Sequence, residues 1–340
     1  MDRGNGFRRP SIIVTRTPLR VSFAGGGTDL AVFYERGGGA VLSTAIDKYI
    51  WVTVKQHGPV FDERIRVTYS RTESVSTVDE VQNDIARECL RFLAIEPPIY
   101  ISTVGDLPAS TGLGGSGSFA VGLLNALHAF RGERVSAAQL AEEACHIEID
   151  LLRQPIGKQD QYAAAYGGLN LFSFRPGGWV TVEPQRLPER LLNELFDQIL
   201  LFWTGHQRDS SAVLGEQRAN TDHRLEELEA MREQAYELQS LLRRADGCAA
   251  DVGHLLNRAW QLKRRLASTV SSGQIDDWYQ RALDAGAYGG KICGAGGGGF
   301  LLVIADPARK AAVCEALRDL KAVTVRPESH GSQIMLPLMD

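Results

Sequence analysis

Four glycines stand within the six residues from Gly112 to Gly117, between a β-branched run and an apolar run. Glycine loses more backbone entropy on folding than any other residue, so this cluster calls for a reason. A glycine-rich turn between a strand and a helix lets backbone N–H groups approach an anion at the helix N-terminus. The segment therefore predicts a phosphate-binding loop, with a tight turn that binds no ligand as the alternative.

Two well-known phosphate loops do not account for this segment. The P-loop pattern GxxxxGK(S/T) is excluded, because no lysine follows the glycines. Gly112, Gly114 and Gly117 fit the GxGxxG pattern of dinucleotide-binding proteins, which also requires a second parallel strand with an acidic end about 20 residues later. Glu133 lies at that distance but follows helical sequence. The sequence therefore disfavours a nicotinamide-dependent dehydrogenase.

Two further segments combine glycines with charged residues. PLRVSFAGGGTDL at residues 18–30 sets Arg20 and Asp29 around a glycine triplet. PIGKQDQYAAAYGG at residues 155–168 places Asp160 before an alanine-rich run. Phosphoryl transfer needs a group that accepts or orients the proton of the attacking hydroxyl, and a carboxylate can serve. A fixed guanidinium can pair with that carboxylate and with phosphate oxygens.

Each charged residue of interest also has a structural alternative. Asp160 could cap the helix that begins at QYAAAY, and Asp29 with Thr28 could cap the segment LAVFYERG. Arg20 could be an exposed strand arginine. Glu148, at the edge of the apolar stripe of its expected helix, could be a solvated charge. The residues alone leave these alternatives open.

A third glycine run, KICGAGGGGFLLV at residues 291–303, completes a set of motifs that resembles the GHMP kinase family. The three motifs occur in the order of that family and span residues 18–303. The resemblance implies an α+β, two-domain GHMP kinase fold. A ribosomal-protein-S5-like, ATP-binding N-terminal domain would cover residues 1–190, and a ferredoxin-like C-terminal domain residues 191–340. The active site would lie between the two domains.

The resemblance also implies roles for individual residues. Asp160 and Arg20 would be catalytic, and Ser116 with Glu148 would bind Mg²⁺. The family loop reads GLGSSAA, so Gly115 replaces its first serine and Ser116 is the matching hydroxyl. The ATP phosphates would lie on Gly112, Leu113, Gly114, Gly115, Ser116, Gly117 and Ser118. The sugar substrate would contact Gly26, Gly27, Thr28, Asp29, Lys158, Arg208, Gly296 and Gly297.

Within the family, FAGGGTDL, TGHQRDSS and GGKICGAGGGGF resemble the heptose 7-phosphate kinases. This implies ATP-dependent phosphorylation of the anomeric hydroxyl of a sugar phosphate, D-glycero-D-manno-heptose 7-phosphate, to the 1,7-bisphosphate. The sugar phosphate would be held by Lys158 or Arg208, with Lys291 and Arg16 as further basic residues. The alternatives are a kinase for an unphosphorylated sugar of fucose or galactose type, and a catalytically silent protein that binds sugar and ATP.

The rest of the sequence must position these motifs. A chain of 340 residues is long enough for two domains. The formal net charge of −4 excludes the basic footprint typical of nucleic-acid binders. No stretch approaches the roughly 20 apolar residues of a membrane span. Five scattered cysteines without CxxC spacing indicate reduced thiols in the cytoplasm, and a homodimer is a further expectation.

Hydrophobic periodicity predicts the elements. The helix after the glycine loop is apolar nearly all round, so we expect it to be buried. Strands are expected at residues 11–16, 19–25, 48–56, 64–70, 99–105, 167–174, 179–184 and 198–205, and helices at residues 78–93, 119–130, 136–152, 222–244, 252–270 and 276–286, before a final strand, helix and two strands.

Overall fold

Two long antiparallel strands, β1 (Ile12–Ala24) and β2 (Gly39–Gln56), form the centre of the first sheet. The structure is a computed structural model and describes residues 12–58, 60–207, 210–244 and 249–338. Two separate strands were expected where β1 lies. They are one strand because the register with β2 shifts next to Pro18, and this irregularity accommodates a residue that cannot donate a ladder hydrogen bond.

The first sheet combines strands from both ends of the chain. In the described residues its order is β12-β1-β2-β5-β3-β4, and β6 joins β7 to β2. The remaining strands are β3 (Ile65–Thr68), β4 (Thr72–Val75), β5 (Ile99–Gly105), β6 (Leu169–Phe174), β7 (Val180–Pro184) and β12 (Gln333–Leu338).

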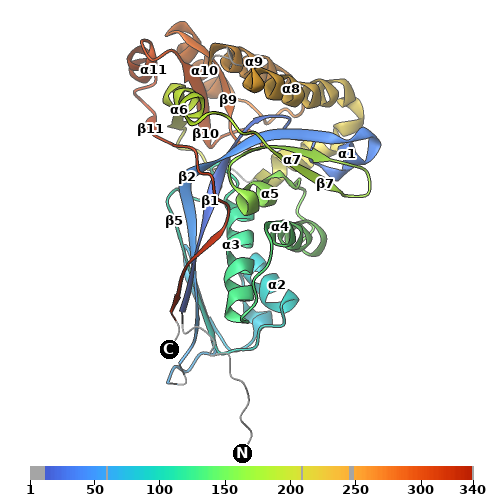
Figure 1. The fold of residues 1–340 in the computed structure, drawn as a ribbon, viewed down its shortest axis with the longest axis vertical. Helices are drawn as coiled ribbons and strands as arrows, with labels where there is room; N and C mark the ends of the chain where they lie inside the picture. Colours follow the sequence, from blue (N-terminus) through green and yellow to red (C-terminus); the bar gives the residue numbers. More distant parts are fainter. Residues whose placement is uncertain (1–11, 59, 208–209, 245–248, 339–340) are drawn as a thin grey trace, which may run out of the picture.

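Helices cover one face of this sheet, as Figure 1 shows for α2 to α5 beside β1, β2 and β5. The buried helix after the glycine loop is confirmed, because almost every residue of α3 from Gly117 on is buried. A Cβ at Gly122 would lie 2.6 Å from Thr17 Oγ1, so glycine lets α3 pack closely on β1. Helix α1 (Ala31–Gly37) connects β1 and β2. The helices on this face are α2 (Asp84–Phe92), α3 (Gly115–Phe130), α4 (Ala137–Cys145) and α5 (Gln159–Tyr166).

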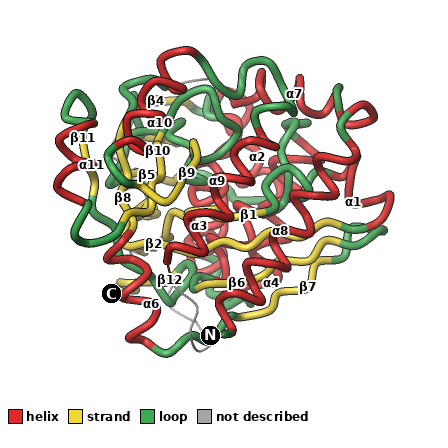
Figure 2. The backbone as a smooth tube through the Cα atoms, turned by 90° about the horizontal axis from the view of Figure 1, so that it is seen from above, coloured by secondary structure: helices red, strands yellow, loops and turns green. Residues whose placement is uncertain are grey.

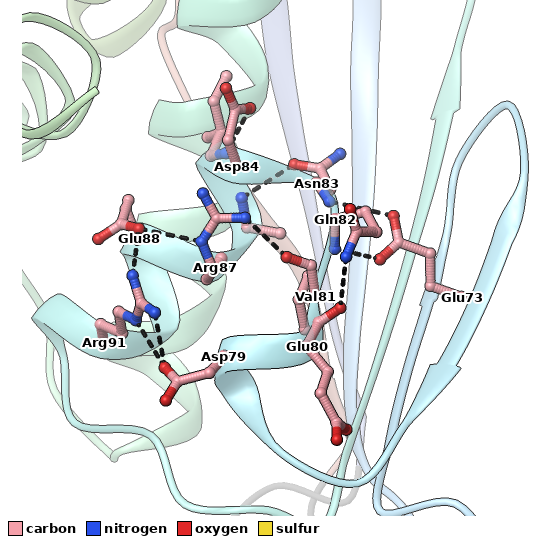
Figure 3. A network of polar contacts seen from close by, with 12 residues as sticks. Glu73, Asp79, Glu80, Val81, Gln82, Asn83, Asp84, Arg87, Glu88 and Arg91 are labelled. Carbon is pink, nitrogen blue, oxygen red and sulfur yellow. Dashed lines mark hydrogen bonds and ion pairs between the residues drawn. The ribbon is translucent and has the colours of Figure 1, made fainter. Parts of the chain in front are cut away.

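The expected helix over residues 78–93 is shorter in the structure. A 3₁₀ turn, Val78–Glu80, comes first, and α2 starts only after Asn83, whose side chain caps it. Figure 3 shows the reason: Glu73 accepts the backbone N–H groups of Gln82 and Asn83, at 2.5 and 3.0 Å. These bonds hold the segment outside a helix, which a periodicity argument cannot detect.

The second sheet has the order β11-β8-β10-β9 among the described residues. Figure 2 shows β8, β9 and β10 side by side, with α9 next to β9. The strands are β8 (Ile199–Trp203), β9 (Ala287–Ile292), β10 (Phe300–Ala305) and β11 (Lys321–Val323). The helices are α6 (Glu189–Gln198), α7 (Ser210–Ala219), α8 (Leu225–Arg243), α9 (Ala249–Lys263), α10 (Gly273–Asp284) and α11 (Lys310–Ala316).

Strand β9 is absent from the expected elements because AYGGKI reads as a loop. Its glycines instead serve close packing. A Cβ at Gly290 would lie 2.1 Å from the carbonyl oxygen of Leu302 on β10, and one at Gly253 of α9 would lie 2.5 Å from Tyr288 Cβ. Glycine therefore lets α9, β9 and β10 approach one another.

The last strand, β12, pairs with β1 and so returns to the first sheet. This pairing covers an edge of β1 that would otherwise be open. A single cut between residues 190 and 191 therefore does not separate the two sheets, and the expected domain boundary there stays a prediction. Within the described ranges, no helix has both the length and the apolar character needed to cross a membrane.

Candidate active site

The glycine loop turns sharply and then enters α3. Gly112 and Gly114 have φ of +81° and +79°, in the left-handed region that favours glycine. A Cβ on Gly112 would also lie 2.5 Å from the carbonyl oxygen of Cys293. A Cβ on Gly115, by contrast, would meet nothing within 4 Å. The glycine loop at residues 112–117 and the glycine run at residues 291–303 thus pack backbone to backbone, and the loop is open at Gly115.

One pocket brings together residues of the segments 18–30, 112–118, 155–168 and 291–303. Of the predicted site residues, it is lined by Arg20, Gly26, Gly27, Asp29, Gly112, Gly114, Gly115, Ser116, Asp160 and Gly296. Its described lining does not include Thr28, Leu113, Gly117, Ser118, Glu148, Lys158 or Gly297. Arg208 lies outside the described residues.

An ion pair between Arg20 and Asp160 lies at this pocket. Arg20 Nε and Nη2 lie 2.8 and 2.6 Å from Asp160 Oδ1, and Nη1 donates to the carbonyl oxygen of Gly112 at 2.7 Å. Arg20 is buried, so the exposed-strand alternative is wrong. The N-cap of α5 is Lys158, and the Asp160 carboxylate bonds to Arg20 instead of capping the helix. Both groups are therefore held in place beside the glycine loop.

Gly117 acts through packing. A Cβ at this position would lie 3.0 Å from Asp160 Cβ and 3.1 Å from the backbone of α5. The absence of a side chain therefore lets the start of α3 approach the start of α5. This approach brings the Asp160 carboxylate beside the loop that opens α3.

Asp29 is buried and held by three hydrogen bonds. Its Oδ1 accepts from the N–H of Gly27 at 3.0 Å and from Gln159 Nε2 at 3.1 Å, and its Oδ2 accepts from the N–H of Gln159 at 3.2 Å. Burial, with the nearby carboxylate of α5, raises the pKa of Asp29. The capping alternative is wrong, because the N-cap of α1 is Leu30.

The hydroxyls of Thr28 and Ser118 are used inside the fold. Thr28 Oγ1 lies 2.8 Å from the carbonyl oxygen of Gly25 and accepts from the N–H of Ala40 at 3.0 Å. Ser118 Oγ donates to the carbonyl oxygen of Pro18 at 2.7 Å. Both side chains are buried, so the expected ligand roles of these two hydroxyls are corrected to structural ones.

Glu148 lies inside the protein, because the expected helix over residues 136–152 changes its geometry. After α4 the chain continues as a π-helical turn, His146–Leu151, a feature common at functional sites. Glu148 is 1% exposed, which makes the solvated-charge alternative wrong. Its Oε2 accepts from Gln161 Nε2 at 2.6 Å, and the nearby Ser116 hydroxyl acts to lower the pKa of the carboxyl. Burial raises the pKa of Glu148 to about 7.

The Glu148 carboxylate and Ser116 hydroxyl are oxygen donors of the kind that Mg²⁺ prefers. Ser116 lines the pocket, and Glu148 lies near Ser116 but outside the described lining. Within the described chain, no cluster of three or more His, Cys, Asp or Glu side chains could hold a metal on its own. The donor set therefore fits Mg²⁺ only if phosphate oxygens and water supply the remaining ligands.

Three polar side chains that sequence reasoning missed also line the pocket. Ser22 Oγ, Gln159 Oε1 and Gln217 Nε2 are buried and have no hydrogen-bond partner among the described residues. Buried polar atoms normally have partners, so these three indicate that a polar ligand completes the site. Gln217 shares an i, i+4, i+8 spacing with the buried residues Val213 and Thr221, which placed it on an inner face.

The basic residues expected to hold a substrate phosphate are placed differently. Lys158 Nζ donates to the carbonyl oxygen of Gly178 at 2.8 Å, beyond the pocket. Side chains two positions apart on a helix point about 200° apart, so Lys158 and Asp160 face different ways. Arg16 lies over the ring of Tyr49. Lysines 263 and 291 do line the pocket, and Lys263 was not expected.

Comparisons with known proteins agree with this arrangement. The N-terminal domain of the GHMP kinases matches residues 77–168, and their C-terminal domain matches residues 224–322. The chain is 30% identical to D-glycero-alpha-D-manno-heptose 7-phosphate kinase of Campylobacter jejuni, with 90% of this chain and 93% of that protein covered. It is 25% identical to a galactokinase of Pyrococcus furiosus, at 90% and 93% coverage.

Solved structures share the fold. A D-glycero-D-manno-heptose 1-phosphate kinase from Bacteroides thetaiotaomicron aligns with a TM-score of 0.78 at 24% identity, covering 95% of this chain and 99% of that one. Lactococcus lactis galactokinase complexed with galactose aligns with a TM-score of 0.72 at 17% identity, covering 96% and 95%. The expected α+β fold is confirmed. With its glycine motifs gathered at one pocket and both domains matched, the chain belongs to the GHMP kinase family.

Proposed function

We propose that this chain is an ATP-dependent kinase that phosphorylates the anomeric hydroxyl of D-glycero-D-manno-heptose 7-phosphate and releases the 1,7-bisphosphate. One observation carries the proposal: the Asp160 carboxylate, fixed by Arg20, faces the same pocket as the glycine loop. A carboxylate beside a phosphate loop is the arrangement that phosphoryl transfer to a hydroxyl requires. The 30% identity to the Campylobacter jejuni enzyme supports the choice of sugar.

The ATP phosphates would lie against the open side of the glycine loop. Gly112, Gly114, Gly115 and Ser116 line the pocket there, and the N-terminus of α3 presents unpaired backbone N–H groups to an anion. Leu113 and Gly117 support the loop from behind. Mg²⁺, held by Ser116 and Glu148, would neutralise charge on the phosphates.

The sugar hydroxyl would approach Asp160 from the pocket side. Asp160 would accept the proton of that hydroxyl as its oxygen attacks the γ-phosphorus of ATP in line, and ADP would leave. Arg20 keeps the carboxylate oriented through two contacts to Oδ1 and keeps it beside the loop through Gly112. The guanidinium also adds positive charge where negative charge develops during transfer.

A polyhydroxylated substrate suits the other wall of the pocket. Asp29, Gly26 and Gly27 line it, together with the unpaired polar atoms of Ser22 and Gln217. Sugar hydroxyls both donate and accept hydrogen bonds, so they can satisfy these groups. The pocket also includes Gly296 of the third glycine run, which would bound the sugar site, with Gly297 behind it. We expect the cytoplasm as the compartment and a homodimer as the assembly, as the sequence predicts.

The test is a substrate panel with purified protein, ATP and Mg²⁺. ADP release is measured with heptose 7-phosphate, the unphosphorylated heptose, galactose and fucose. The proposal expects the highest kcat/KM with heptose 7-phosphate. A higher kcat/KM with fucose or galactose would mean that the substrate is an unphosphorylated sugar. If no ADP is released with any of these sugars, the result would favour a catalytically silent binding protein.

A further inference from the structure

Two lysines lie in the wall of the pocket although lysine is almost never fully buried. Lys263 ends α9 and is 5% exposed, and Lys291 lies in β9 and is 4% exposed. Both line the same pocket as Arg20 and Asp160. No role in nucleotide binding or in the proton transfer described above uses either side chain.

Both ammonium groups donate hydrogen bonds to backbone carbonyl oxygens. Lys291 Nζ donates to the carbonyl oxygens of Ser22 at 2.8 Å and Phe23 at 3.2 Å, and Lys263 Nζ donates to the carbonyl oxygen of Gly294. Across the residues that the structure describes, no carboxylate forms a salt bridge with either lysine. An ammonium has three donors, so one N–H of Lys291 and two of Lys263 remain for a ligand.

The surroundings of these two lysines disfavour the positive charge of their ammonium groups. Burial, with a smaller contribution from the charge of Arg20, lowers the pKa of Lys291 to about 8. Burial lowers the pKa of Lys263 as well, with the charge of Lys291 next in weight. A buried, unpaired charge is costly unless a partner arrives. Arg20 is paired with Asp160, so Lys263 and Lys291 are the cations of the described lining that have no salt bridge, and they favour an anionic group on the ligand.

We infer that Lys263 and Lys291 bind the phosphate group of the sugar substrate, and this inference rests on the proposed function. Lys291 is anchored on Ser22, in the strand that leads to Asp29 on the sugar side of the pocket. The nucleotide phosphates have their own donors at the start of α3. Lys158 and Arg16 point elsewhere, so these lysines are the described basic side chains that remain for a second phosphate.

The experiment compares Lys263→Met and Lys291→Met with wild type and with Lys310→Met, a control whose lysine is half-buried on α11 and does not line the pocket. Steady-state kinetics are measured for heptose 7-phosphate, for the unphosphorylated heptose and for ATP. Calorimetry measures binding of heptose 7-phosphate without ATP. Each variant should raise KM and Kd for heptose 7-phosphate by about 10-fold or more, the scale of a lost charge-assisted hydrogen bond. Kinetics with ATP and with the unphosphorylated heptose should not change, which also shows that the variants fold.

Three results would overturn the inference. A rise in KM for ATP alone would assign the lysines to the nucleotide phosphates. An equal rise in KM for both sugars would indicate that the two lysines only support the backbone of Ser22, Phe23 and Gly294. Unchanged binding of heptose 7-phosphate would show that the lysines do not contact its phosphate. If wild type phosphorylates no sugar, the proposed function fails separately, and the calorimetric comparison still decides the role of the lysines.

Discussion

Asp160→Asn removes a negative charge at almost constant volume, so it separates catalysis from folding. We expect kcat to fall by about 10² or more, the scale of general acid–base catalysis, because the amide cannot accept the proton of the sugar hydroxyl. KM for ATP should change little, since the glycine loop is intact. ADP-release kinetics at saturating ATP measure both quantities.

The cost to stability follows from the burial of the pair. The Arg20 side chain is 4% exposed and that of Asp160 is 26% exposed. Breaking a fully buried ion pair costs about 3–5 kcal/mol and breaking an exposed one about 0–1 kcal/mol. The asparagine oxygen can still accept from Arg20, which also keeps its bond to Gly112. We therefore expect a loss of about 1–2 kcal/mol in the free energy of unfolding, measured by urea denaturation.

Asp79→Asn is the matched control. Asp79 pairs with Arg91 at 2.6 Å on the surface near α2, remote from the pocket (Figure 3). That variant should keep wild-type kcat. Near-wild-type turnover of Asp160→Asn would refute the role of Asp160 as proton acceptor, and complete unfolding of that variant would mean that the ion pair is mainly structural.

Three further predictions concern neighbouring groups. Ser116→Ala and Glu148→Gln should each raise the Mg²⁺ concentration needed for half-maximal turnover, whereas an unchanged Mg²⁺ titration would remove both residues from the metal site. Gly117→Ala should lower kcat with little effect on KM for ATP, because the new methyl group displaces the start of α5; wild-type kcat would contradict this. Burial acts to lower the pKa of His128, but hydrogen bonds to two glutamates outweigh it and raise the pKa above its ordinary value. The stability that this group contributes is therefore present at low pH and lost as pH rises through that pKa. His128→Gln should flatten this part of the pH profile in urea denaturation, and an unchanged profile would contradict the assignment.

The residues that form the pocket could be predicted from the sequence, because a run of glycines indicates a place where two backbone segments approach closely. Gly112 has a positive φ, and a Cβ at either Gly112 or Gly117 would lie within 3.0 Å of a neighbouring segment. The direction in which an individual side chain points was harder to predict from the sequence. Lys158 stands in a recognised motif yet points at Gly178, because its direction depends on where α5 begins.

The residues that were missed lie on elements outside the motifs. Lys263 continues the buried spacing of Leu256 and Trp260 along α9, so a cation on an apolar stripe was the available signal. The inward position of Glu148 depends on a π-helical turn, which ordinary helical periodicity does not predict. Ser22 gave no signal, because its unpaired hydroxyl becomes evident only once the pocket around it is assembled.

The position of the new phosphate on the sugar shows directly whether this chain phosphorylates the anomeric hydroxyl of heptose 7-phosphate. Purified protein is incubated with ATP, Mg²⁺ and heptose 7-phosphate, and the product is examined by ³¹P NMR with correlation to its protons. We expect a second phosphate signal coupled to the anomeric proton, with the original phosphate unchanged, and no such product with Asp160→Asn. A phosphate on another hydroxyl, or ADP release without a phosphorylated sugar, would contradict this expectation.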